Sequence, residues 1–229
     1  MDVAILYSGG KDSNLAVEYC LKRNWNIKYL LSVKPTRTDC YLFHYATVEH
    51  TKKQAEALGL KHIYAECSVA DQRLEANIVK TIVEKNPVDA VVLGGTGLQV
   101  TQIESIQKAL RDLKVEAFAS HAGEDHGILF KKMIDDGYEI MITQIASDGL
   151  KRWLGRIVTK ENFEELRKDS AEYGFHIGFD GGYADSFVLN SPLFKERLYP
   201  VSIKKNFESE YCGYVEFELK RKNIVDAFY

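Results

Sequence analysis

An apolar run that leads into a polar glycine turn constrains this chain more than any other stretch. Residues 2–7 read Asp-Val-Ala-Ile-Leu-Tyr, and residues 8–13 read Ser-Gly-Gly-Lys-Asp-Ser. The run predicts a buried strand, and apolar residues at helical spacing after the turn predict a helix. These residues are Leu15, Ala16, Tyr19 and Cys20. A strand that enters a helix through a glycine turn is an arrangement that binds phosphate.

The residue types of this turn suit an anion. Gly9 and Gly10 allow positive φ and a close approach of the backbone to a ligand. The start of the helix offers N–H groups and the positive end of the helix dipole. Lys11 adds a cation, and Ser8 and Ser13 add hydroxyl donors.

Asp12 is an acid in a turn that suits anions, and it fits there if Mg²⁺ bridges it to phosphate groups. The turn is not a Walker A loop, because that motif requires a glycine where Ile5 stands. The alternative interpretation is a Gly-Gly turn beside a solvated Lys-Asp pair.

Short apolar segments then alternate with helical patterns. Strands are predicted at 27–33, 62–65, 90–93 and 115–119, with helices around 48–58, 74–82 and 103–113. This alternation predicts an α/β fold with a parallel sheet and helices on both faces. Ligands of such sheets bind beyond the carboxyl ends of the strands. We therefore expect the turn 8–13, the loop after Val33 and the segment Gly94–Gly97 to meet, with Ser32 and Gly94 in a nucleotide site.

The pattern changes near residue 120. A helix around 128–136, a strand at 140–145 and a helix bearing Phe163, Leu166 and Tyr173 come first. Thr159 is the predicted N-cap of the last helix. Strand-like segments follow at 186–189 and 214–219. We predict two domains: 1–120 binds ATP, and 121–229 is a smaller α+β lobe that binds the substrate.

Charge and cysteine content narrow the function classes. A net charge of −3 and a pI near 6.1 argue against a general nucleic-acid binder. No apolar run reaches membrane-spanning length, and the strand-like start predicts no signal peptide. The four cysteines form no Cys-x-x-Cys pair, so we expect reduced thiols and a cytoplasmic protein.

The string Ser-Gly-Gly-Lys-Asp-Ser resembles the PP-loop of the ATP pyrophosphatases, which split ATP to AMP and pyrophosphate. Later segments resemble one branch of that group, the diphthine–ammonia ligases, also known as N-type ATP pyrophosphatases. The segments that carry this resemblance are Cys40-Tyr41-Leu42-Phe43-His44, Trp153-Leu154-Gly155-Arg156, Asp180-Gly181-Gly182-Tyr183-Ala184-Asp185-Ser186 and Pro192-Leu193-Phe194.

The resemblance implies an adenine nucleotide alpha hydrolase-like fold and an ATP-dependent, amide-forming ligase. The carboxylate of diphthine on elongation factor 2 would attack the α-phosphate, and ammonia would then displace AMP. Cofactors would be ATP and Mg²⁺, and a homodimer is left open. The implied catalytic residues are Lys11 and Asp12, with Asp12 also meeting Mg²⁺ through the phosphates. The implied nucleotide contacts are Ser8, Gly9, Gly10, Lys11, Asp12, Ser13, Ser32 and Gly94. The implied substrate contacts are His44, Gln102, Arg156, Asp180, Gly181, Gly182 and Asp185.

The chain departs from the family at one informative place. The family carries Tyr-Gln-Arg-x-Arg where residues 101–105 read Thr-Gln-Ile-Glu-Ser, so Gln102 is kept and both arginines are absent. Asp180 and Asp185 replace glutamates. Losing two cations near a carboxylate or a phosphate is not conservative. Two alternatives therefore stay open: a paralogue that adenylates another acceptor, and a non-catalytic adenine-nucleotide binder.

Several residues also have a purely structural interpretation. His44 fits an ordinary loop histidine, Arg156 an ion pair, and 180–182 a turn before a strand. Trp153 is of a type found more often in cores than in contacts. The residues His121, Glu124, Asp125 and His126 resemble a metal cluster, although acidic residues at such a place more often begin a helix.

Overall fold

The computed structural model describes residues 1–37, 42–43, 47–96 and 100–220. The chain divides into two compact units. Unit 1 comprises Met1–Ala55 and Leu60–Glu124, and unit 2 comprises Glu56–Gly59 and Asp125–Tyr229.

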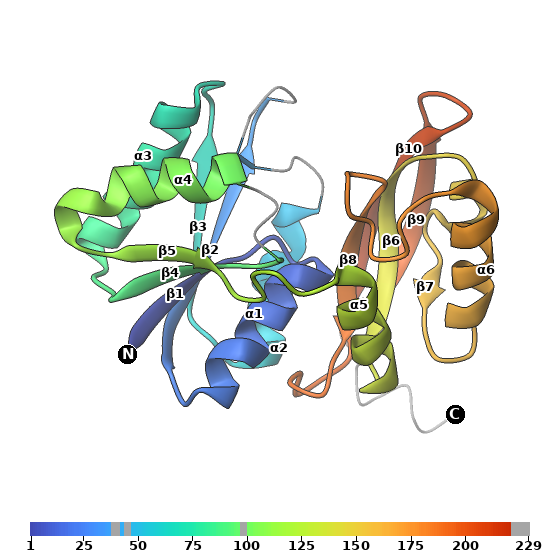
Figure 1. Cartoon of the computed structure of the whole chain (residues 1–229), viewed down its shortest axis with the longest axis horizontal. Helices are drawn as coiled ribbons and strands as arrows, with labels where there is room; N and C mark the ends of the chain where they lie inside the picture. The colour runs from blue at the N-terminus through green and yellow to red at the C-terminus, as the bar shows by residue number, and fades with distance from the viewer. Residues whose placement is uncertain (38–41, 44–46, 97–99, 221–229) are drawn as a thin grey trace. The chain divides into compact units, whose positions relative to one another are not determined.

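Unit 1 contains a parallel sheet of five strands in the order β3-β2-β1-β4-β5 (Figure 1). The strands are β1 (Asp2–Leu6), β2 (Asn26–Pro35), β3 (His62–Cys67), β4 (Ala90–Leu93) and β5 (Glu116–Ala119). The central strand β1 pairs with β2 on one side and with β4 on the other. The order of strands therefore reverses at β1, which is where open α/β sheets bind ligands. The predicted α/β fold is confirmed.

The helices of unit 1 cover both faces of this sheet. On one face lie α1 (Lys11–Lys22), the short 3₁₀ turn η1 (Val48–His50) and α2 (Thr51–Leu58); on the other lie α3 (Gln72–Lys85), α4 (Val100–Leu110) and the 3₁₀ turn η2 (Arg111–Leu113) (Figure 1). Ala76, Val79 and Val83 of α3 are buried in a core cluster together with Ile106 and Leu110 of α4. Leu74, at the start of the helix predicted around 74–82, is 50% exposed and lies outside this cluster.

Local sequence signals set the ends of these helices. Asp71 precedes α3 and its carboxylate accepts the Leu74 N–H at 2.9 Å, as an N-cap does. The helix ends at Asn86, before Pro87, because the residue before a proline disfavours the helical region. Gly59 follows α2 with φ +70°, the left-handed conformation in which glycine commonly ends a helix.

Unit 2 contains an antiparallel sheet. Its strands are β6 (Glu139–Ala146), β7 (Ile157–Val158), β8 (Ala184–Asn190), β9 (Tyr199–Phe207) and β10 (Cys212–Lys220). The order is β7-β6-β10-β9, and β8 pairs with β6. Neither β7 nor β9 was predicted. β7 is only two residues long. In β9, Tyr199, Val201 and Ile203 alternate with polar residues or proline, so the sequence carried a strand signal there that was not used.

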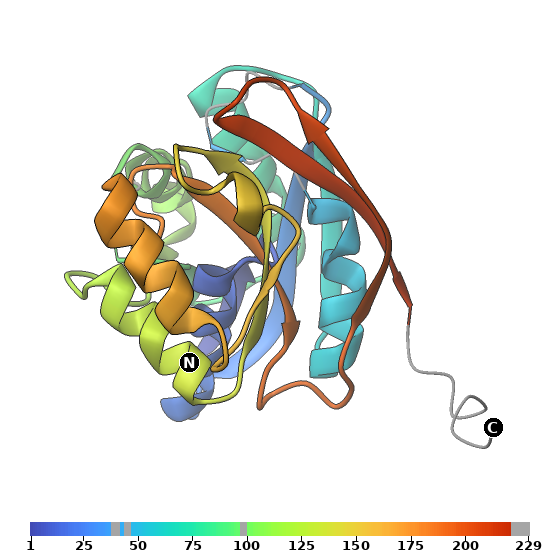
Figure 2. The ribbon, with the colours of Figure 1, turned by 90° about the vertical axis from the view of Figure 1, so that its right-hand side faces the viewer.

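Two helices complete unit 2, α5 (His126–Asp135) and α6 (Phe163–Tyr173), with the 3₁₀ turn η3 (Lys151–Trp153). They lie side by side (Figure 2), and the rings of Phe130 and Phe163 are 5.4 Å apart. The predicted N-cap Thr159 is wrong. Asn162 holds that position, and its Oδ1 atom instead accepts the Thr159 N–H at 3.0 Å. None of the helices in the described part of the chain is both long and apolar enough to span a bilayer.

Candidate active site

The glycine turn joins β1 to α1. Gly9 has φ +85°, so the predicted use of glycine for positive φ is confirmed there. Gly10 is different: it is the N-cap of α1 in an extended conformation, with φ −73°. Ser13 closes the turn, because its hydroxyl accepts the Gly9 N–H at 3.1 Å and donates to the Gly10 carbonyl at 3.0 Å. The turn is thus a rigid loop that opens directly into a helix.

Side chains from neighbouring elements hold the carbonyl groups of this loop. Ser32 of β2 donates its hydroxyl to the Tyr7 carbonyl at 2.6 Å. Gln54 of α2 donates its amide to the Gly9 carbonyl at 2.9 Å. Both donors are fully buried. Ser32 therefore lies beneath the loop, where it fixes the backbone.

Asn14, in the first turns of α1, holds the same loop from the other side. Its Nδ2 atom donates to the Gly10 carbonyl at 2.9 Å and to the Gly9 carbonyl at 3.3 Å. The Tyr7 hydroxyl donates to Asn14 Oδ1 at 3.0 Å. Burial raises the pKa of Tyr7 far above its usual range, so this hydroxyl stays protonated and remains a donor.

Holding the carbonyls orients the N–H groups. The peptide bonds of the loop are trans, so the N–H of each unit points away from its own carbonyl. With three carbonyls turned toward buried donors, the N–H groups of the following residues turn the opposite way. These residues are Ser8, Gly10 and Lys11, and of these the Gly10 N–H donates a long hydrogen bond of 3.5 Å to the Ser8 hydroxyl. N–H groups directed outward at a helix N-terminus form a cradle for an anion.

Lys11 and Asp12 place one charge of each sign at this cradle. The Lys11 Nζ atom lies 2.9 Å from both Asp12 carboxylate oxygens, and the two side chains are 6% and 30% exposed. A carboxylate that is partly exposed and next to an anion cradle is the oxygen ligand that Mg²⁺ prefers. The residues present therefore fit Mg²⁺ at Asp12.

Gly94, at the end of β4, lies against the start of α1. A Cβ atom at this position would come within 2.5 Å of the backbone carbon of Asp12 and 2.6 Å of the Ser13 nitrogen. Only glycine permits so close an approach. Two of the three segments that were expected to meet, the turn 8–13 and the start of 94–97, therefore do meet.

The loop after β2 lies partly outside the described residues, and His44 is among the residues not described. Within the described part, Leu42 is held at both backbone groups. Its N–H donates to the Glu75 carboxylate of α3 at 2.7 Å, and its carbonyl accepts from the Gln102 amide of α4. In this structure the Gln102 amide thus binds the protein's own backbone at Leu42.

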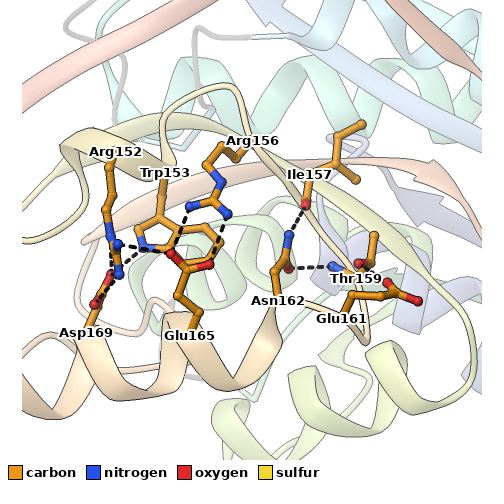
Figure 3. Close-up of polar contacts among 9 residues, drawn as sticks. All are labelled: Arg152, Trp153, Arg156, Ile157, Thr159, Glu161, Asn162, Glu165 and Asp169. Carbon is orange, nitrogen blue, oxygen red and sulfur yellow. Dashed lines mark hydrogen bonds and ion pairs between the residues drawn. The ribbon is translucent and has the colours of Figure 1, made fainter.

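In unit 2, the Trp-Leu-Gly-Arg segment packs against α6 (Figure 3). Trp153 is fully buried, as expected for a core residue, and its indole N–H donates to Asp169 at 2.6 Å. Arg152 donates to both oxygens of the same carboxylate, at 2.7 and 2.6 Å. Asp169, itself 5% exposed, is thus satisfied by three charge-assisted or polar donors.

Arg156 forms the second part of this network (Figure 3). Its guanidinium lies 4.1 Å from the centroid of the Trp153 ring and donates to Glu165 at 3.0 and 3.3 Å. The hydrogen bond from Arg156 lowers the pKa of Glu165. Of the two interpretations of Arg156, the described contacts are those of an ion pair stacked on an aromatic ring.

The segment Asp180–Asp185 leads into β8. Asp180 Oδ1 lies 3.4 Å from Nε2 of the buried His126, and Gly181 and Gly182 follow with φ +93° and +81°. Asp185 is half-buried in β8 and pairs with Gln144 of β6. The segment therefore combines a glycine turn with carboxylates on both sides of it.

The residues at 121–126 that resemble a metal cluster include an acidic residue, Asp125, that caps a helix. Asp125 is the N-cap of α5 and accepts the Ile128 N–H at 2.8 Å. Within the described residues, no group of three or more His, Cys, Asp or Glu side chains could hold a metal ion.

Four polar side chains that form hydrogen bonds within these sites were not identified from the sequence. Asn14, Gln54, Glu75 and Asp169 are all nearly or fully buried, although their residue types favour the surface. Asn14 directly follows the recognised string, and Gln54 lies one residue before Ala55 of the predicted apolar face. A polar residue on the buried face of an amphipathic helix is the signal that could have identified both of them.

The sheet order, the switch point at β1 and the carbonyl-held glycine loop define an α/β protein of the PP-loop class. Comparison with protein-family models identifies a single family within this class. Residues 1–117 match the diphthamide synthase N-terminal domain, and residues 125–224 match the diphthamide synthase C-terminal domain. The chain belongs to the diphthamide synthase family.

The curated relatives that match this chain are named diphthine–ammonia ligases. The human diphthine–ammonia ligase is 27% identical over 226 residues, which cover 86% of this chain and 82% of the human protein. The diphthine–ammonia ligase of Danio rerio is 29% identical over 222 residues and covers 86% of each chain. This chain is accordingly an enzyme of the ATP-dependent ligase class.

A solved structure also resembles this chain. It is described as a predicted subunit of a tRNA methyltransferase from Methanocaldococcus jannaschii, with 18% identity and a TM-score of 0.43. The match covers 61% of this chain and 77% of that one. A likeness this distant carries no argument about function.

Proposed function

We propose that this enzyme forms an amide from a carboxylate and ammonia, and converts ATP to AMP and pyrophosphate. The observation that carries the proposal is the loop between β1 and α1, whose carbonyls are held inward so that its N–H groups face outward. Such a cradle suits the β- and γ-phosphates as a leaving group. We propose residues 1–120 as the ATP-binding domain and 121–229 as the substrate-binding lobe.

The first step needs positioning and charge neutralisation. A carboxylate oxygen attacks the α-phosphorus, the bond from that phosphorus to the bridging oxygen breaks, and pyrophosphate leaves with the electron pair. Lys11 and the outward N–H groups stabilise the charge that develops on the leaving group. Mg²⁺, when bound through Asp12, neutralises phosphate charge.

The second step needs no side-chain nucleophile. The nitrogen of ammonia attacks the acyl carbon of the adenylate, the acyl carbon–oxygen bond breaks, and AMP leaves. The nitrogen then loses one proton to solvent, which leaves the neutral amide. Products are the amide, AMP and pyrophosphate, so atoms and charge balance.

The proposed acceptor is the diphthine carboxylate of elongation factor 2, in diphthamide biosynthesis. The names of the human and Danio rerio relatives support it. We propose His44, Gln102, Arg156, Asp180, Gly181, Gly182 and Asp185 as substrate contacts. For Gln102 and Arg156 this requires substrate to compete with their present partners, the Leu42 carbonyl and Glu165.

A second candidate keeps the AMP-forming chemistry but uses another acceptor. The specific observation in its favour is the segment 101–105, which lacks both arginines of the family pattern. Guanidinium groups bind carboxylate and phosphate with two parallel hydrogen bonds, so their loss changes what the site recognises.

One assay separates these candidates. The full chain is incubated with ATP, Mg²⁺, ammonia and diphthine-bearing elongation factor 2, and AMP and amidated factor are measured. AMP together with amidated factor supports the first proposal. AMP with a different carboxylate, but none with that factor, supports the second. Nucleotide binding with no AMP from any carboxylate would contradict both.

Replacing the loop cation tests the cradle itself. Lys11→Ala should lower the rate of AMP formation about 100-fold or more, because it removes a charge directed at the leaving group. Lys22→Ala is the matched control, since Lys22 lies in the same helix but pairs with Glu18 on the exposed side. An unchanged melting temperature shows that the fold is intact. Near-normal turnover of Lys11→Ala would refute the proposed leaving-group site.

A further inference from the structure

His62 of β3 lies between two hydroxyl groups of unit 1. Its Nε2 atom is 2.9 Å from Ser32 Oγ and 3.1 Å from Thr51 Oγ1. Ser32 comes from β2 and is fully buried, and Thr51 begins α2 and is fully buried as well. One ring nitrogen therefore contacts two buried oxygens from two different elements.

The donor and the acceptor in these hydrogen bonds can be assigned from the number of protons that each group carries. A hydroxyl group carries a single proton. The Ser32 hydroxyl donates it to the Tyr7 carbonyl at 2.6 Å, and the Thr51 hydroxyl donates it to the Val48 carbonyl at 2.6 Å. Neither oxygen has a proton left for His62. The Nε2 atom must therefore carry the proton and donate it to both oxygens.

The result is a one-way chain of hydrogen bonds that ends at the phosphate loop. It runs from the His62 Nε2–H to the Ser32 hydroxyl and on to the Tyr7 carbonyl. Hydrogen bonds linked in this sense polarise and strengthen one another. Tyr7 is the first carbonyl of the loop, and its orientation turns the Ser8 N–H outward.

We propose that His62 is a positioning residue of the ATP site: as an obligatory Nε2–H donor, it directs the Ser32 proton onto the Tyr7 carbonyl and so orients the phosphate loop. The proposal rests on the proposed function, because it assumes that ATP binds at this loop. His62 acts through Ser32 and does not touch the nucleotide.

The first test uses three variants of the full chain. His62→Gln keeps an amide donor near the position of Nε2, whereas His62→Leu removes the donor. Leucine should raise the KM for ATP about tenfold, the effect of about one hydrogen bond, and should leave the KM for ammonia unchanged. Glutamine should restore the KM for ATP to within about threefold of wild type. His50→Leu, which removes a half-buried histidine outside this chain of bonds, should have no effect.

Several outcomes would overturn the proposal. One is an equal KM for ATP in His62→Leu and wild type. Another is an equal rise in the KM for ATP and for ammonia, which indicates general loss of structure. A third is a failure of glutamine to rescue while the melting temperature is normal.

The second test does not depend on ATP. In the full chain labelled with ¹⁵N-histidine, the His62 resonances should show a protonated Nε2. Protonation at Nδ1 alone would overturn the assignment of His62 as donor. If wild type shows this tautomer but binds no ATP, the proposed function fails and the hydrogen-bond direction stands.

Discussion

At the scale of single residues, steric contacts decide how close two backbone segments can come. Gly94→Ala places a methyl group 2.5 Å from the Asp12 backbone carbon, so the start of α1 must move. A displacement of about 1 Å at a reacting centre costs about 100-fold in rate. We expect AMP formation to fall about 100-fold, as measured by an AMP assay under saturating ATP.

Gly123→Ala is the control for this substitution. Gly123 has a positive φ of +81°, which Gly94 does not, and an added Cβ at Gly123 would meet nothing within 4 Å. It should cost about 1–2 kcal/mol of stability with no loss of rate. If Gly94→Ala and Gly123→Ala formed AMP at the same rate, the close contact between residue 94 and the Asp12 backbone would have no effect on the reaction.

A buried carboxylate is the second feature that acts at this scale. Asp169→Ala leaves the Trp153 indole N–H and one side of Arg152 without their described acceptor. Arg152 is 52% exposed and can be solvated, but the Trp153 N–H stays buried, and a buried donor without a partner costs about 1–3 kcal/mol. Urea unfolding followed by tryptophan fluorescence should show a loss of that size.

The exposed ion pair on the same helix provides the comparison. Glu164→Ala breaks the Glu164–Arg167 pair, both of whose side chains are more than half exposed. Exposed pairs contribute about 0–1 kcal/mol, so stability should change little. If Glu164→Ala lost as much free energy of unfolding as Asp169→Ala, the burial of Asp169 would not determine how much its contacts stabilise the protein.

At the scale of the elements, the α5 cap links stability to pH. The Ile128 N–H lowers the pKa of Asp125 below its usual 3.8. A lowered folded-state pKa means that the charged cap stabilises the protein above pH 3.8, and that this contribution is lost as pH falls through the lowered value. Asp125→Ala should therefore lose about 1 kcal/mol at pH 7.

Urea titrations at pH 7, 5 and 3 check this dependence. The stability difference between wild type and Asp125→Ala should shrink at pH 3. Asp125→Asn keeps a capping oxygen but carries no charge, so its stability relative to Asp125→Ala should not change between pH 7 and pH 3. A difference that stays constant from pH 7 to pH 3 would show that the carboxylate charge plays no part.

At the scale of the whole molecule, the chain has two units, and the proposed phosphate loop lies in unit 1. Adding ATP and Mg²⁺ should slow amide hydrogen exchange in the loop at 7–14 and at the end of β4, both in unit 1. At 100 times the dissociation constant, ligand binding stabilises the protein that binds it by about 2.7 kcal/mol. Mass spectrometry of peptides measures the exchange. Protection confined to residues 125–220 would place the nucleotide elsewhere.

The sequence alone determined the order of elements in unit 1 and the position of the glycine turn that enters α1. Both depend on local signals: the periodicity of apolar residues and the glycines of the turn. The family resemblance was also readable, because its motifs are contiguous strings. Signals of this kind need no knowledge of which segments are neighbours in space.

The tertiary structure alone decided what each polar side chain does. Ser32 proved to support the loop, Arg156 pairs with Glu165, and Asn162 took the cap position expected of Thr159. Gln54 reaches the Gly9 carbonyl across 45 residues of sequence. A hydrogen bond depends on distance and direction in space, and sequence separation fixes neither. The edge strand β9 is a different case, because its alternating residues Tyr199, Val201 and Ile203 are a local signal that the sequence did contain.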